Sequence, residues 1–222
     1  YKKYRNEPEL RAVYEAGKKL VEWSKVADKI YFWDYPAEYL CVNSIFPQFH
    51  TIPMTYRFAV QCNVKGVYIN GNGCASCQFS ELTTYLLAKV LWNPELSDKE
   101  YNRHIDEFLQ GYYGAGWRYI RKFIDYTYNL VKDRVWGGVS QPQDIIPVDA
   151  SGEHVRIMKE LFDKALESSR TQAEKNRIKR SALQVEYYDL YSTMDEEYAK
   201  EDESGKNCLV QRNETLYKEL QR

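Results

Sequence analysis

The sequence lacks the features by which membrane proteins, nucleic-acid-binding proteins and disulfide-rich secreted proteins are usually recognised. Its apolar runs are only a few residues long, whereas a transmembrane helix needs roughly 20 apolar residues, so we expect no membrane partner. The 31 basic and 32 acidic residues are mostly interspersed and leave a net charge of −1. This balance provides no broad cationic surface for nucleic acid. Five cysteines, an odd number, do not make a disulfide framework.

Several catalytic signatures are also missing. The sequence contains no Ser-His-Asp grouping, no phosphate-binding loop and no Gly-x-Gly-x-x-Gly fingerprint, and it has no internal repeat of solenoid length. Residues 1–5 are already charged, without Met or an apolar signal core. We therefore expect the chain to be part of a longer polypeptide or a processed product, and its localisation stays unknown.

Aromatic residues, in contrast, are abundant, with 20 Tyr, 8 Phe and 5 Trp. Tyr and Trp combine a flat apolar face with a polar edge, which suits half-buried helix packing and equally suits stacking against sugar rings. Composition alone leaves both interpretations open.

The first half of the chain predicts alternating helices and strands. Apolar residues recur at helical spacing over residues 7–27, and the aromatic, β-branched segment 29–36 then predicts a strand. A second helix is expected over residues 52–62 and a second strand over residues 66–69. The two strands and the helix between them form a β-α-β unit, expected to be parallel. Because two strands do not make a stable sheet, we expect the remainder of a longer polypeptide or another chain to complete it.

The rest of the chain predicts helices. A helix is expected over residues 79–92, and capping boxes at residues 97–100 and 171–174 mark two further helix starts. Glycines are expected to break one helix at residues 111–116. The other expected segments are a helix from about residue 117 to 134, a loop at residues 136–150 and helices over residues 152–169, 171–199 and 207–220.

Seven short motifs follow one another in order through the central region. They are Gly66-Val67-Tyr68, Gly71-Asn72, Phe79-Ser80-Glu81-Leu82, Tyr85-Leu86-Leu87-Ala88-Lys89, Leu91-Trp92-Asn93-Pro94, Glu107-Phe108 and Gly111-Tyr112-Tyr113-Gly114. With these motifs the chain resembles a bacterial family of unknown function, over about residues 30–126 and more weakly over residues 161–191. That family is found in proteins similar to glycoside hydrolases, notably α-glucuronidases and β-hexosaminidases with (β/α)8 barrels.

The resemblance implies a helix-dominated α/β fold. Residues 1–135 would be a partial (β/α)-barrel segment with about two parallel strands, and residues 136–222 a helical extension that forms a C-terminal bundle. The resemblance also implies the C-terminal part of a glycoside hydrolase with a carbohydrate ligand, and we expect no cofactor and no metal. Members often carry a carboxylate just before the Gly-Asn pair, where this chain has Ile69 and Asn70.

The candidate site residues lie where the two predicted strands end, because barrel enzymes bind substrate at that face. Asp34 is the candidate catalytic carboxylate. It could also be an acceptor for a ribose-like hydroxyl, or a turn residue that bonds its own backbone. Trp33, Tyr35, Asn70 and Asn72 are the candidate substrate-binding residues, although Trp33 suits core packing as well. Glycoside hydrolysis commonly needs two carboxyl groups, and the partner of Asp34 is expected outside this chain.

Other features leave several interpretations open. Cys74 and Cys77 could be a free pair, a redox disulfide or half of a zinc site. His50 lies near the predicted strand ends and could be a ligand, while His104 and His154 suit the surface. The competing functional hypothesis is a non-enzymatic helical interaction module, whose aromatic residues would all be structural.

Overall fold

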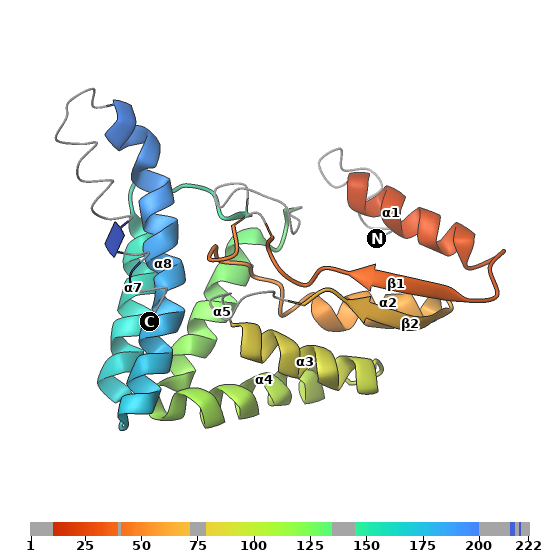
Figure 1. Ribbon diagram of the computed structural model, residues 1–222, viewed down its shortest axis with the longest axis horizontal. Helices are drawn as coiled ribbons and strands as arrows, with labels where there is room; N and C mark the ends of the chain where they lie inside the picture. The colour runs from red at the N-terminus through yellow and green to blue at the C-terminus, as the bar shows by residue number, and fades with distance from the viewer. Residues whose placement is uncertain are drawn as a thin grey trace.

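The computed structural model describes residues 11–39, 41–71, 79–134 and 145–199, together with residues 214, 215 and 218. Its elements occur in the order α1 (Arg11–Trp23), β1 (Ile30–Asp34), α2 (Ile52–Gln61), β2 (Val64–Ile69), α3 (Ser80–Trp92), α4 (Asp98–Tyr113), the 3-10 turn η3 (Gly114–Gly116), α5 (Trp117–Val131), α7 (Glu153–Ser168) and α8 (Gln172–Ala199). Figure 1 shows the two strands on one side of the molecule and α7 and α8 on the other. The prediction of a helix-dominated α/β fold with two parallel strands is confirmed.

The two strands pair in parallel, and α2 connects them and packs against β2. Tyr31 lies opposite Gly66, Trp33 opposite Tyr68 and Asp34 opposite Ile69. The predicted β-α-β unit is therefore present, although β2 begins at Val64, two residues before the predicted start. This register brings the carboxyl ends of both strands to the same edge of the sheet.

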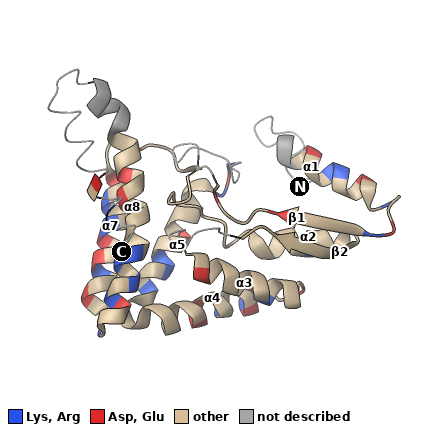
Figure 2. Ribbon diagram, in the orientation of Figure 1, with Lys and Arg blue, Asp and Glu red and all other residues tan. Residues whose placement is uncertain are grey.

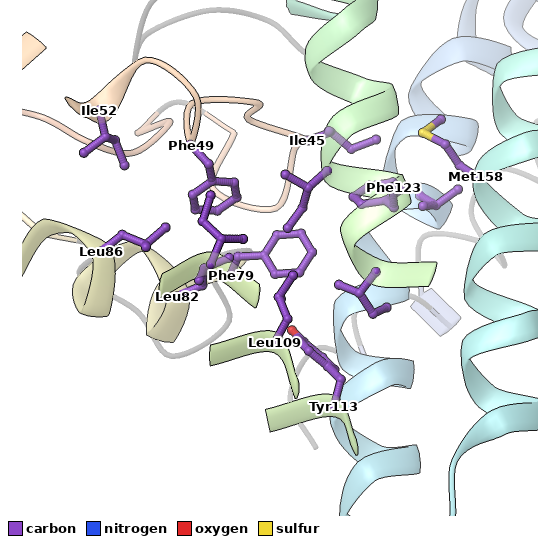
Figure 3. Close-up of a cluster of buried hydrophobic side chains, with 14 of the residues drawn as sticks. Ile45, Phe49, Ile52, Phe79, Leu82, Leu86, Leu109, Tyr113, Phe123 and Met158 are labelled. Carbon is purple, nitrogen blue, oxygen red and sulfur yellow. The ribbon is translucent and has the colours of Figure 1, made fainter. Parts of the chain in front are cut away.

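One hydrophobic core joins the segment before α2 to the helices that follow the sheet (Figure 3). Ile45 and Phe49 meet Leu82 of α3, Leu109 of α4 and Phe123 of α5 within this core. The core extends onward to buried residues of α7 and α8. The sheet is thus held against a helical body, and the predicted division between residues 135 and 136 stays a prediction.

Both predicted capping boxes are confirmed. The Glu100 amide donates to Ser97 Oγ at 3.2 Å, and the Ser97 amide donates to Glu100 Oε2 at 2.9 Å. At the start of α8, the Glu174 amide donates to Thr171 Oγ1 at 3.1 Å, and the Thr171 amide donates to Glu174 Oε2 at 3.2 Å. Each box satisfies two amide groups that the first helical turn leaves without a partner.

The glycine-rich segment 111–116 ends the helix α4 later than predicted. The helix α4 passes through Gly111 and ends at Tyr113, and Gly114 then takes a φ of +57°. Gly116 lies where the chain passes α7, because a Cβ added to it would be 2.6 Å from the Ala165 carbonyl oxygen. The break therefore depends on the last two glycines, and Gly111 is an ordinary helical residue.

The ends of several predicted elements lie outside the described residues. These are the first residues of the predicted helix 7–27, most of the loop 136–150 and nearly all of the predicted helix 207–220. Within the described ranges, none of the helices combines the length and the apolar character that a membrane crossing requires.

Candidate functional site

Aromatic side chains cover one face of the two-stranded sheet. Successive side chains of a strand point to opposite faces, so Tyr31, Trp33 and Tyr35 lie on the same side of the chain. Trp33 is 64% exposed, and Tyr68, which pairs with it across the sheet, is 58% exposed. We call Tyr31, Trp33, Tyr35 and Tyr68 the aromatic face. Its exposure shows that Trp33 does not pack into the core of the described residues.

The rings of the aromatic face are neighbours. The centroids of Trp33 and Tyr68 are 4.9 Å apart, edge to face, and the planes of Trp33 and Tyr35 are within 15° of each other at 6.2 Å. Tyr31 lies over Gly66, because a Cβ added to this glycine would be 3.0 Å from the ring. Trp33, Tyr35 and Tyr68 therefore form a continuous aromatic surface near the carboxyl edge of the sheet, and Tyr31 lies on the same side of β1.

Asp34 and Asn70 lie side by side at this edge. The Asn70 amide donates to the Asp34 carbonyl at 2.9 Å, which extends the strand pairing by one residue beyond β2. Tyr39 closes the edge, because its hydroxyl donates to the carbonyl of Asn70 and, at 3.1 Å, to that of Gly71. The fourth predicted binding residue, Asn72, lies outside the described residues.

The Asp34 carboxylate is bound on the opposite side of the sheet from the aromatic face. Its Oδ2 accepts a hydrogen bond from the Tyr56 hydroxyl of α2 at 2.5 Å, and its Oδ1 accepts one from the Tyr35 amide at 2.9 Å. Burial raises the pKa of Tyr56 well above its ordinary value, and the bond to Asp34 raises it further. This geometry agrees with the turn interpretation of Asp34, and its catalytic role stays a prediction.

A second carboxylate near the edge, Glu38, is almost fully buried. Only 3% of this residue is exposed. It lies near Tyr187 of α8. Burial raises the pKa of Tyr187 most, and a hydrogen bond with Cys41 and the nearby Tyr191 and Glu38 raise it further. The segment after β1 thus packs against α8. No signal in the sequence indicates this contact, because the two segments are far apart along the chain.

Glu81 is a third carboxylate to consider, in the first turn of α3, the helix that follows β2. It accepts a hydrogen bond from the Tyr112 hydroxyl at 3.1 Å and lies 3.4 Å from Arg180 of α8. Arg177 stacks on the Tyr112 ring at 4.4 Å. This cluster links α3, α4 and α8, and we assign it to the packing of these helices.

His50 is tied to the helical body. Its Nε2 lies 2.9 Å from Asp125 Oδ1, and Arg121 donates to the same carboxylate at 3.0 Å. Burial alone would raise the pKa of Asp125, but the hydrogen bonds from His50 and Arg121 outweigh it and lower this pKa. The contact anchors the segment before α2 on α5.

The other histidines and cysteines do not form a metal site among the described residues. His104 lies near the Tyr85 hydroxyl, and His154 Nδ1 is 2.9 Å from the Tyr126 hydroxyl. Both histidines are half-buried, whereas the sequence predicted that they lie on the surface. Across the described ranges, no three His, Cys, Asp or Glu side chains are grouped to hold a metal ion. The predicted pair of Cys74 and Cys77 lies outside these ranges.

Comparison with known families matches residues 6–125 to a domain of unknown function (DUF4838). The match covers more than half of the chain. No curated protein matches the chain, and no solved structure does. The comparisons therefore give a family without an activity, so a functional argument depends on the geometry of the site.

Proposed function

We propose that this chain, which belongs to the DUF4838 family of unknown function, is a carbohydrate-active protein and binds a glycan on the aromatic face. The observation that carries this proposal is the exposure of the aromatic face. Trp33 is 64% exposed, Tyr35 50% and Tyr68 58%, and these residues lie at or near the carboxyl ends of the two strands.

The chemistry of these rings suits a sugar. One face of a pyranose ring carries several C–H groups, which can pack on an aromatic ring, while the sugar hydroxyls reach polar groups at the ring edges. Tyr35 and Tyr68 offer hydroxyls, and Asn70 offers a neutral amide at the edge of the sheet. Covering about 100 Å² of Trp33 would contribute about 2.5 kcal/mol at 25 cal/mol per Å².

We further propose that added strands complete the sheet. A sheet of two strands is rarely stable alone, and parallel sheets are normally covered on both faces. Strands from a longer polypeptide or from another chain would extend the sheet into the (β/α)-barrel that the family resemblance implies. Trp33 and Tyr68, each one residue before the end of its strand, would then lie in the last inward layer, beside the substrate face of the barrel.

Hydrolysis is supported by the family resemblance, and binding by the geometry. Cleavage of a glycosidic bond commonly needs two carboxyl groups, and Asp34 is the candidate that this chain contributes. Its carboxylate would have to leave the Tyr56 hydroxyl to reach a sugar on the aromatic face. The second carboxyl group would come from the added strands.

The proposal is tested by calorimetric titration of the full-length protein with hexose, hexosamine and uronic-acid oligosaccharides. Trp33→Ala should weaken binding about 10-fold to 100-fold, which corresponds to the lost burial. Trp92→Ala is the matched control, because Trp92 is 91% exposed at the other end of α3, and it should bind as the wild type does. Equal affinities for both variants, with circular dichroism showing an intact fold, would show that the sugar does not bind at Trp33. Failure of the wild type to bind any of these sugars would instead favour the non-enzymatic interaction module.

A further inference from the structure

We infer that the aromatic face selects neutral sugars, such as hexose or N-acetylhexosamine residues, over uronic acids. This inference rests on the glycan-binding function proposed above and names the class of ligand that the same site takes. Charge carries the argument, because a uronic acid differs from the matching hexose by one carboxylate.

The two segments that reach the carboxyl edge of the sheet contain no basic residue. Residues 30–56 and residues 66–88 include neither Lys nor Arg. The chain has 31 basic residues in 222, so stretches of this combined length would carry about seven at the average density. Proteins bind carboxylate ligands chiefly with Arg or Lys, and neither segment provides one.

Four basic residues adjoin these segments along the chain: Lys29, Arg57, Lys65 and Lys89. Arg57 of α2 is bonded to the Leu96 carbonyl and to Asp98, and Lys89 lies in the last turn of α3. The other two lie at the amino ends of the strands. Lys29 directly precedes β1, and Lys65 is the second residue of β2. At about 3.3 Å per residue, Lys29 is about 13 Å from Trp33 along the strand. A sugar stacked on Trp33 therefore lies beyond contact distance of the Lys29 backbone position.

The charges that these segments do bring to the carboxyl edge are negative. Asp34 ends β1, with its carboxylate on the side opposite the aromatic face, and Glu38 follows it by four residues. Glu81, in the first turn of α3, is paired with Arg180 and belongs to the helix packing described above. Figure 2 shows red at the carboxyl end of β1 and blue at its amino end. A uronate carboxylate at this edge would come close to acidic residues, and neither segment supplies a cation to offset their charge. The side chains of the aromatic face and Asn70 are neutral, and they match a neutral sugar.

The test compares oligosaccharides of equal length and linkage that differ only in charge. The full-length protein is titrated with β-1,4-linked glucose and N-acetylglucosamine tetrasaccharides and with the β-1,4-linked glucuronic acid tetrasaccharide. We expect the neutral ligands to bind at least about 10-fold more tightly. The uronate should gain affinity as salt rises, because salt screens repulsion between exposed charges.

A second variant tests the same inference by adding the missing cation. Tyr35→Lys should narrow the ratio between neutral and uronate affinity by about 10-fold, whereas Trp92→Lys, at the exposed end of α3, should leave it unchanged. Uronate binding that is equal or tighter in the wild type, and weakened by salt, would overturn the inference and leave the glycan-binding proposal standing. Failure of every tetrasaccharide to bind would overturn both.

Discussion

Replacing Gly116 by alanine is expected to destabilise the protein by about 3 kcal/mol, at the upper end of the range for overpacked sites. The backbone of Gly116 is right-handed, with φ −76° and ψ −8°, so alanine adds no conformational strain. Its Cβ, however, would lie 2.6 Å from the Ala165 carbonyl oxygen and 3.1 Å from the Ala165 Cα. These are backbone atoms within α7, and they cannot turn aside as a flexible side chain can.

Gly111→Ala is the matched control, five residues earlier in the same glycine-rich segment. It lies inside α4, and nothing is within 4 Å of a Cβ added there. Alanine is a better helix former than glycine by about 0.5–1 kcal/mol, so this variant should be more stable than the wild type. The two substitutions are chemically identical, and only their surroundings give them opposite signs.

Urea unfolding followed by far-ultraviolet circular dichroism measures both effects. The unfolding midpoint should fall for Gly116→Ala and rise for Gly111→Ala, with similar dependence of the free energy on urea. A Gly116→Ala variant within about 0.5 kcal/mol of the wild type, the usual range of harmless surface changes, would show that η3 and α7 are not in close contact.

Three further predictions concern side chains that form hydrogen bonds. Tyr56→Phe should lower the free energy of unfolding by about 1–2 kcal/mol at neutral pH. The folded state raises the pKa of Tyr56 above 10.0, so the stabilisation from this residue is fully present below pH 10.0 and declines above it. The free energy of unfolding should therefore depend less on pH, between pH 8 and 11, in the variant than in the wild type. Ser97→Ala should cost about 1 kcal/mol through the lost cap, and an unchanged melting temperature would contradict it. Asp125→Asn should reduce the loss of stability on acidification. The folded state lowers the pKa of Asp125 below its ordinary value of 3.8, so the ionised carboxylate stabilises the fold above pH 3.8, and this stabilisation is lost as the pH falls through the lowered pKa. Parallel acid-unfolding curves for the variant and the wild type would refute this.

Local patterns in the sequence were sufficient to predict most of the elements. The β1 strand lies within the predicted segment 29–36, and both capping boxes form as their residue types indicate. Gly111 shows the limit of such patterns. A glycine is compatible with a helix when tertiary packing supports it. Within residues 111–116, only Gly114, with its positive φ, and Gly116, with its close neighbour, require glycine.

The candidate site was predictable in position and less so in orientation. Parallel pairing placed Asp34 beside Asn70, as the order of the elements implied. Alternation along β1 also implied that Trp33 and Asp34 face opposite sides of the sheet. The side of the sheet that α2 covers is the side on which Tyr56 contacts Asp34. This is a tertiary contact between two elements, so the residue pattern of one segment does not predict it.

The central claim, that sugars bind on the aromatic face, is tested most directly by nuclear magnetic resonance of the tryptophan indole groups. The chain has five Trp residues, and Trp→Phe variants assign their indole N–H signals. On addition of a neutral tetrasaccharide to the full-length protein, the Trp33 signal should shift, whereas those of Trp23 and Trp92, also exposed, should stay in place. A constant Trp33 signal under conditions where the sugar binds would contradict the account.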